Sequence, residues 1–218
     1  MKKIYFLLIV FAFANTIQSQ IQVSAIDYLD TNNVRAAIIC NADFGWDFSN
    51  SQYEVPKGSG KHPLFCGSLW IGGYHNGGLR MAANTYRQNG IDFWPGPLDT
   101  TNASITIPVS NQWNQLWKIT SNQINQFIQQ WNLGNVQSGA FIPPTVILNW
   151  PAHGTGNQAK YLAPFVDVNG NGIYNPVLEG DYPLIKGDQM IWWVINDVLA
   201  IHGETGAAAI GEIGRAHV

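Results

Sequence analysis

The stretch NVRAAIIC, Asn33–Cys40, determines the fold class that we predict. A short apolar run that is bounded by polar turn residues and contains β-branched residues is typical of a β-strand. Comparable runs recur between Gly, Pro and Asn residues, while charged residues make up only 11% of the chain. We therefore predict an all-β, β-sandwich-like domain, with strands at Val34–Cys40, Leu64–Ile71, Leu79–Tyr86, Ala103–Val109, Val146–Trp150 and Met190–Ile195.

One amphipathic α-helix interrupts this series of strands. The segment Thr120–Gln123 has the form of a capping box, and Gly134 supplies a stop signal. Between these signals the apolar residues recur at helical spacing, so one side of the helix should pack on a sheet and the Asn- and Gln-rich side should face water. The apolar residues at i, i+3, i+4 and i+7 are Ile124, Phe127, Ile128 and Trp131.

Residues 1–19 have the pattern of a secretory signal peptide. Two lysines precede an apolar run from Ile4 to Ala14, and Ser19 stands at the expected cleavage point. The apolar run is shorter than the roughly 20 residues that a membrane-spanning helix needs, and no later segment approaches that length. We expect a secreted or cell-surface protein with no membrane span.

The charge balance argues against a nucleic acid partner. The chain has 11 Lys and Arg against 14 Asp and Glu, a formal net charge of −3. Phosphate binding depends on clustered basic residues, and the basic residues of this chain are scattered. We therefore expect partners other than nucleic acid.

The two cysteines, Cys40 and Cys66, each lie in a predicted strand. In an oxidising compartment outside the cell a disulfide between them is favoured, and closing this loop would contribute roughly 3 kcal/mol in the chain-entropy model. The alternative is two separate buried thiols. A catalytic cysteine is less favoured than either, because the sequence indicates no histidine partner.

The segment DVNGNGIYNP, Asp167–Pro176, resembles the start of a calcium loop. Such loops take oxygen ligands from alternate positions, and a glycine at position 6 allows the tight turn, here Gly172. Position 12 is Leu178, so the closing carboxylate would have to come from just beyond it. The predicted Ca²⁺ ligands are Asp167, Asn169, Asn171, the Ile173 carbonyl, Glu179 and Asp181.

Two asparagines in place of aspartates reduce the negative charge of this loop. We expect weak binding, with a Kd on the order of 10⁻⁴ to 10⁻³ M, as in extracellular calcium modules. The metal would stabilise the loop rather than carry out chemistry. The alternative is an Asn- and Gly-rich turn without metal, because both residues favour left-handed turns.

The nine tryptophans offer a second kind of candidate site. Trp94, Trp192 and Trp193 lie in or beside predicted strands, and exposed indole rings could stack on sugars. The adjacent pair must point to opposite faces of a strand, so one ring should fill the core. The competing interpretation is that the tryptophans are core and loop anchors, because large aromatic residues are mostly buried.

Sequence motifs for catalysis are absent. The five histidines form no H-E-x-x-H pattern, and no G-x-S-x-G or phosphate-binding glycine loop precedes a helix. Carboxylates such as Asp43, Asp47, Asp92 and Glu204 could pair for glycoside hydrolysis, but a sequence does not give their separation. Enzymatic activity therefore stays open, and a non-enzymatic role is favoured.

Four long phrases of the sequence carry a family resemblance. They are YEVPKGSGKHPLFCGSLWIGG (Tyr53–Gly73), AANTYRQNGIDFWPGPLDT (Ala82–Thr100), LAPFVDVNGNGIYNPVLEGDYPLIKGDQMIWWVIND (Leu162–Asp197) and HGETGAAAIG (His202–Gly211). These phrases closely resemble the N-terminal region of large secreted proteins from Bacteroidetes that end in a type IX secretion sorting domain. The resemblance implies a cell-surface or released protein, and the type IX export machinery as a partner through a C-terminal domain missing from this chain. It implies no particular biochemical activity.

The last six residues, IGRAHV, have no counterpart in that resemblance. They can be encoded by a stretch that matches a common sequencing adapter. We therefore expect residues 20–212 to form a β-rich extracellular domain that is incomplete at its C-terminus, and residues 213–218 to be a non-native tail.

These expectations combine into three functional hypotheses. The favoured one is a calcium-stabilised structural or adhesive module of a larger exported protein. The second is a carbohydrate-binding module that uses exposed tryptophans, with glycans or surface proteins as partners. The third, which has the least support, is an extracellular hydrolase.

Overall fold

A computed structural model describes residues 23–75, 77–84 and 92–198. Within these ranges the chain consists mostly of strands in several small antiparallel sheets, with few short helices. The expected signal peptide at residues 1–19 and the expected tail at residues 213–218 fall outside these ranges, as does Glu204.

The strands are short. They are β1 (Ile26–Leu29), β2 (Arg35–Ile39), β3 (Asp43–Phe44), β4 (Tyr53–Glu54), β5 (Gly67–Ser68), β6 (Trp70–His75), β7 (Gly78–Ala83), β8 (Trp94–Pro95), β9 (Trp117–Thr120), β10 (Phe165–Val166), β11 (Tyr182–Pro183), β12 (Gln189–Trp192) and β13 (Ile195–Asn196). The helices are α1 (Ile107–Gln112), α2 (Ser121–Asn132) and α3 (Thr145–Leu148).

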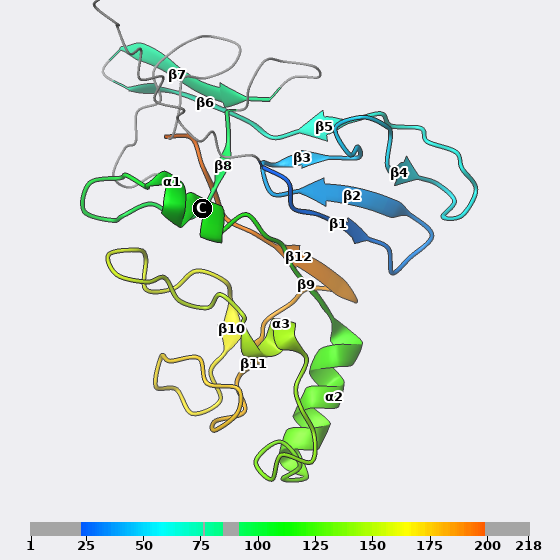
Figure 1. Cartoon of the computed structure of the whole chain (residues 1–218), viewed down its shortest axis with the longest axis vertical. Helices are drawn as coiled ribbons and strands as arrows, with labels where there is room; N and C mark the ends of the chain where they lie inside the picture. The colour runs from blue at the N-terminus through cyan, green and yellow to red at the C-terminus, as the bar shows by residue number, and fades with distance from the viewer. Residues whose placement is uncertain (1–22, 76, 85–91, 199–218) are drawn as a thin grey trace, which may run out of the picture.

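The largest sheet has the order β1-β2-β3-β5, and β4 also pairs with β2. In β1 and β2, Ile26 lies opposite Ile39 and Leu29 opposite Ala36. The other described sheets are two-stranded ribbons: β6–β7, β8–β13, β9–β12 and β10–β11. The β9–β12 ribbon crosses the middle of the molecule, between the largest sheet and α2 (Figure 1).

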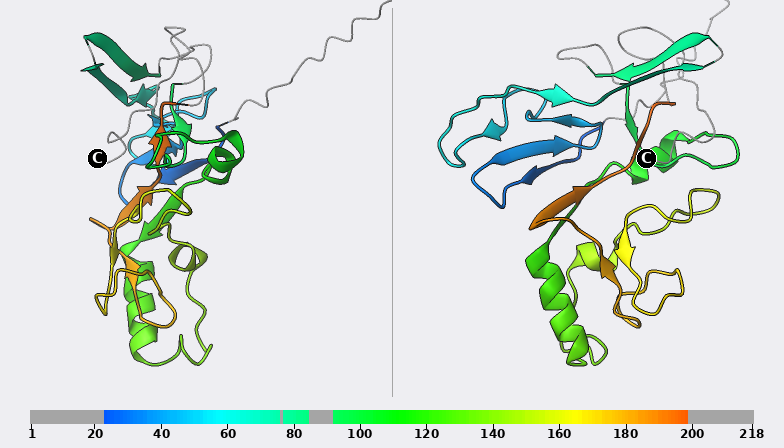
Figure 2. Two further views of the ribbon diagram at one scale, coloured as in Figure 1. Left: turned by 90° about the vertical axis from the view of Figure 1, so that its left-hand side faces the viewer. Right: turned by 180° about the vertical axis from the view of Figure 1, so that it is seen from behind.

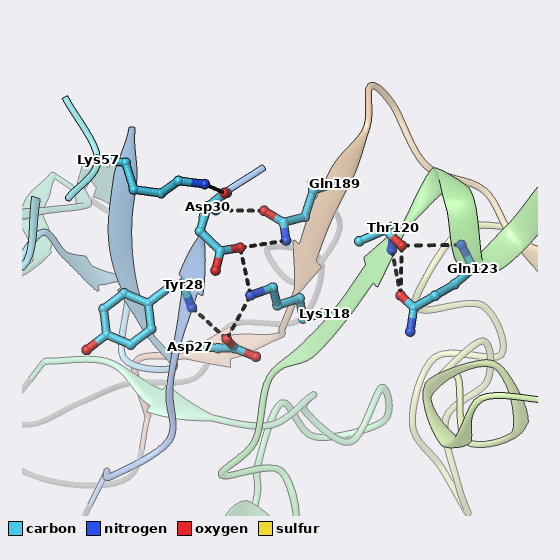
Figure 3. A network of polar contacts seen from close by, with 8 residues as sticks. All are labelled: Asp27, Tyr28, Asp30, Lys57, Lys118, Thr120, Gln123 and Gln189. Atoms are coloured by element: carbon cyan, nitrogen blue, oxygen red, sulfur yellow. Dashed lines mark hydrogen bonds and ion pairs between the residues drawn. The ribbon is translucent and has the colours of Figure 1, made fainter. Parts of the chain in front are cut away.

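A polar network joins β1 to the β9–β12 ribbon (Figure 3). The Lys118 ammonium lies 3.3 Å from Asp27 Oδ1 and 3.0 Å from Asp30 Oδ1. Gln189 accepts a hydrogen bond from the Asp30 backbone N–H and donates one to the Asp30 carboxylate. These hydrogen bonds from Gln189 and Lys118 lower the pKa of Asp30. The network therefore joins the largest sheet to the β9–β12 ribbon, although their strands are far apart in sequence.

The helix α2 forms as the sequence predicts. The Thr120 hydroxyl accepts from the Gln123 N–H while the Gln123 side chain accepts from the Thr120 N–H, and this completes the capping box. Gly134 has a φ of +75°, which suits a residue that ends a helix. Phe127 is fully buried and belongs to the main core cluster. The other members of that cluster are Trp117, Ile119, Ile124, Val136, Ile147, Trp150, Ala152 and Ala163.

Two predicted strands are wrong. The segment Ala103–Val109 contains the start of α1, and Val146–Trp150 overlaps α3. Prolines explain both: Pro108 lies in the first turn of α1 and Pro144 directly precedes α3, and the fixed φ of proline suits a helix start. The strands predicted around β2, β7 and β12–β13 are confirmed, and the run Leu64–Ile71 is divided between β5 and β6.

The β6–β7 hairpin lies at the opposite end of the molecule from α2, as all the views show (Figures 1 and 2). In this hairpin Trp70 pairs with Ala83, Gly72 with Met81, and Tyr74 with Leu79, so these side chains share one face. Trp70 is 66% exposed and Tyr74 is 77% exposed. Apolar side chains are thus buried around α2 and exposed on the hairpin. Across the described residues, no helix has the length and apolar character to cross a membrane.

Candidate functional site

The predicted calcium loop begins after β10 and ends at β11, two strands that pair with each other. Asp181 joins its two ends: Asp181 Oδ1 accepts from the Val168 N–H at 2.8 Å and Oδ2 accepts from the Asn175 N–H at 2.8 Å. Asp181 has no exposed surface. A buried carboxylate that accepts hydrogen bonds from two backbone amides is a fixed structural element, so Asp181 holds the two ends of the loop together.

The side-chain oxygens at positions 1, 3 and 5 face the loop backbone. Asp167 accepts hydrogen bonds from the N–H groups of Gly170 at 2.8 Å and Gly172 at 2.6 Å. Asn169 Oδ1 accepts from the Asn171 N–H at 3.0 Å, and Asn171 Oδ1 from the Ile173 N–H at 2.7 Å. These are Asx-type turns, which wind the chain around the side-chain oxygens.

Glycine is required at position 6 of this loop. Gly172 has a φ of +73°, and a Cβ there would lie 2.6 Å from the Tyr161 hydroxyl. The left-handed conformation and the close approach both exclude a side chain. The sequence signal at Gly172 therefore reflects a real conformational need of the loop, with or without a metal.

Glu179 returns to the loop from beyond position 12. Asn171 Nδ2 donates to Glu179 Oε1 at 3.0 Å, which places this carboxylate beside a predicted ligand. The second oxygen, Glu179 Oε2, is buried and has no hydrogen-bond partner. A buried carboxylate oxygen without a partner destabilises the fold, because it has lost its hydrogen bonds to water and has gained none within the protein. A cation is the partner that would compensate it best.

The loop is also held against the core around α2. The Tyr174 hydroxyl donates to the Ile147 carbonyl at 2.6 Å, and the Tyr174 N–H donates to His153 Nε2 at 2.9 Å. Burial and the nearby negative charge of Asp181 raise the pKa of Tyr174. Trp131 of α2 donates to the Val177 carbonyl at 3.3 Å, and its ring leaves no room for a side chain at Gly180.

The donors of the loop are oxygen atoms, and the structure shows no calcium site among the described residues. The described residues contain no group of three or more His, Cys, Asp or Glu side chains that could hold a metal ion. The loop instead offers the carboxylates of Asp167 and Glu179, two amide oxygens and the Ile173 carbonyl. Hard cations such as Ca²⁺ accept this mixture, whereas Zn²⁺ prefers nitrogen and sulfur. Of the six predicted ligands, Asp181 is fully buried and holds the two ends of the loop, while the side-chain oxygens of Asp167, Asn169 and Asn171 accept from backbone N–H groups within the loop.

The predicted disulfide between Cys40 and Cys66 is not formed, and both thiols are free. Cys40 follows β2 and Cys66 precedes β5, and β3 lies between these two strands. Two strand spacings amount to roughly 10 Å, beyond the reach of a disulfide. Cys40 is buried and donates to Asn114 Oδ1 at 3.0 Å, and desolvation raises its pKa to about 11. Of the alternative prediction, two separate buried thiols, the burial of Cys40 is confirmed, whereas Cys66 is only partly buried.

The structure does not bring the predicted tryptophans together as an exposed platform. Trp94 is only 4% exposed and belongs to a small core cluster. Trp192 packs against the main core cluster, in ring contact with Trp117 and Trp150, whereas Trp193 packs against the cluster that contains Trp94. The adjacent residues Trp192 and Trp193 thus pack against two different clusters, as expected for neighbouring side chains that point to opposite sides. The exposed tryptophan is Trp70, which sequence reasoning did not select.

The suggested catalytic carboxylates have structural partners. Asp43 and Asp92 are both buried, and Asn84 connects them: its Nδ2 donates to Asp43 Oδ1 and its Oδ1 accepts from the Asp92 N–H. Asp47 accepts from the backbone N–H groups of Ser49 and Asn50, and these bonds lower its pKa. This arrangement gives no support to a paired acid and base.

No protein-family model, curated protein or solved structure matches the chain.

Proposed function

We propose that this chain is a structural module of a larger exported protein, and that Ca²⁺ stabilises its Asp167–Asp181 loop. The observation that carries the proposal is Glu179. Its carboxylate approaches the predicted ligand Asn171, and one of its oxygens is buried without a partner. A divalent cation at this point would be held by Asp167 and Glu179, and it would supply the charge that the buried oxygen lacks.

The surroundings of the loop support the proposed structural role. Asp181, Tyr174 and Trp131 fasten the loop to the core around α2, so order in the loop stabilises that part of the domain. The signal-peptide pattern and the resemblance to type IX secreted proteins support export to the cell surface or beyond. The sandwich-like packing of the sheets, the export machinery as partner and an adhesive role belong to the same proposal.

Thermal unfolding with and without Ca²⁺ tests this function. A ligand that binds only the folded state raises the free energy of unfolding by RT ln(1 + [L]/Kd), or about 1.4 kcal/mol at ten times Kd. We expect 10 mM Ca²⁺ to raise the Tm of the protein by a few degrees, and chelator to remove the increase. Asp167→Asn should abolish the increase.

Asp47→Asn is the matched control. Asp47 also accepts hydrogen bonds from turn N–H groups, but it lies outside the candidate loop. This variant should keep the full response to Ca²⁺. A Tm that is the same in Ca²⁺ and in chelator, or one that responds equally in Asp167→Asn, would overturn the proposal.

A further inference from the structure

A hollow of about 250 Å³ opens beside β3 and β5, away from the candidate calcium loop. Three of its lining residues, Cys66, Ser68 and Trp70, alternate in sequence around β5 and the start of β6, and all three face the hollow. Asp43 lies directly opposite Ser68 in the sheet and joins them on that face. Trp46, Gly67 and Asn84 are the other described residues that line the hollow.

The polar floor of the hollow consists of hydrogen-bond acceptors. Asp43 is 6% exposed, and its two oxygens accept from Asn41 Nδ2 and Asn84 Nδ2, both at 3.0 Å. Each carboxylate oxygen has room for a further donor. The Ser68 hydroxyl donates toward the Leu69 carbonyl at 3.4 Å, which leaves its oxygen as an acceptor.

Two side-chain donors of the lining, those of Asn84 and Trp70, are used inside the protein. Asn84 Nδ2 donates to Asp43 and also to the Asn41 carbonyl at 3.1 Å. Trp70 Nε1 donates to the Asn84 carbonyl at 2.8 Å. A ligand that brings hydrogen-bond donors, such as an ammonium group, therefore complements the acceptors of Asp43 and Ser68.

Charge and aromatic surface favour the same ligand. Among the residues that the structure describes, Asp43 is the only charged one that lines the hollow. Burial and the negative charge of Asp43 raise the pKa of the Cys66 thiol. The rings of Trp46 and Trp70 add π faces, and indole is the side chain that attracts cations best. The volume lies below the roughly 300 to 1,000 Å³ of most small-molecule pockets, so it suits one small group.

We propose that this hollow binds a primary alkylammonium group, with its N–H donors on Asp43 and Ser68 and its methylene groups against Trp70. A free amine and the lysine side chain of a partner protein carry the same chemistry. The site is separate from the calcium loop, so the two proposals stand or fall independently.

Titration with n-butylammonium chloride, followed by ¹H–¹⁵N NMR of the full chain, tests the site. We expect saturable shifts of the Ser68 amide and the Trp46 indole, and no such shifts with n-butanol. Asp43→Asn should weaken binding at least tenfold, and Trp70→Ala by about two- to fivefold, the range of an exposed cation–π contact. Asp47→Asn and Asp167→Asn should bind as the unchanged protein does.

Nα-acetyl-lysine methylamide distinguishes the two sources of the ammonium. Binding at least as tight as that of n-butylammonium indicates a lysine of a partner protein, and weaker binding indicates a free amine; both outcomes support the site. Equal binding of n-butanol, unchanged affinity in both Asp43→Asn and Trp70→Ala, or no shift with either amine would overturn the proposal.

Discussion

Asp181 and Asp43 are both buried, yet the two ends of the molecule surround them with different partners. At the α2 end, Asp181 bonds two backbone amides and closes the loop beside the main core cluster. At the hairpin end, Asp43 bonds two side-chain amides and faces a hollow beside the exposed Trp70. A buried charge that is fixed by backbone groups stabilises the fold, while one that is held by side chains beside a hollow is available to a ligand.

The largest expected effect is the difference in lost stability between apolar substitutions at the two ends of the molecule. Phe127→Ala should lower the free energy of unfolding by about 3 to 5 kcal/mol, because it removes a fully buried ring from the core. Leu79→Ala, on the exposed face of the hairpin, should change it by less than about 0.5 kcal/mol. Urea unfolding measures both values. Similar losses in the two variants would show that the hairpin face is buried in solution.

The next effect compares the two aspartates directly. Asp181→Asn should cost about 2 to 3 kcal/mol, because it places an amide NH₂ against a buried backbone N–H. Asp43→Asn should cost about 1 kcal/mol, because the amides of Asn41 and Asn84 can reorient. Urea unfolding of the two variants gives the difference. A larger loss in Asp43→Asn than in Asp181→Asn would reverse the distinction between the two ends.

A smaller effect is expected at the network that joins the two ends. Lys118→Met should cost less than about 1 kcal/mol at pH 7, because Asp27 and Asp30 are partly exposed and water screens the ion pairs. The pKa of Asp30 is lowered in the folded state, so its contribution is present above the unfolded pKa of about 4 and is lost as the pH falls through the folded value.

Lys118→Met should therefore lose most stability near neutral pH and less at pH 3, because the contribution of Asp30 decreases as the pH approaches its lowered pKa. Thermal unfolding at both pH values measures this, with Lys57→Met as a comparison that retains the Lys118 contacts. An equal loss for Lys118→Met at pH 3 and pH 7 would contradict the ionic origin of the effect.

The sequence predicts the parts of this molecule that depend on local signals. The capping box at Thr120 and the stop at Gly134 act within one helix, and both are confirmed. The glycine at position 6 of the candidate loop likewise answers a local need for a left-handed conformation. The strand predicted at Ala103–Val109 is wrong because Pro108 lies in the first turn of α1, where proline favours the start of a helix over a strand.

The candidate sites depend on contacts between distant segments, which local signals do not contain. The role of Asp181 arises from backbone groups at Val168 and Asn175, and the hollow requires β3 to pair with β5. The alternation of Cys66, Ser68 and Trp70 was a usable sequence signal for a shared face. What it could not show is that the facing residue is Asp43, or that β3 separates the two cysteines.

The central claim, that Asp167 and Glu179 hold Ca²⁺ in the loop, is tested most directly by adding Ca²⁺ to ¹⁵N-labelled protein and following the amide resonances by NMR. We expect the amides of Gly170, Gly172 and Glu179 to shift together with one Kd on the order of 10⁻⁴ to 10⁻³ M, while those of Ser49 and Asn50 stay unchanged. Glu179→Gln should weaken this binding at least tenfold. Loop amides that do not move at 10 mM Ca²⁺, or that move equally in Glu179→Gln, would contradict the account.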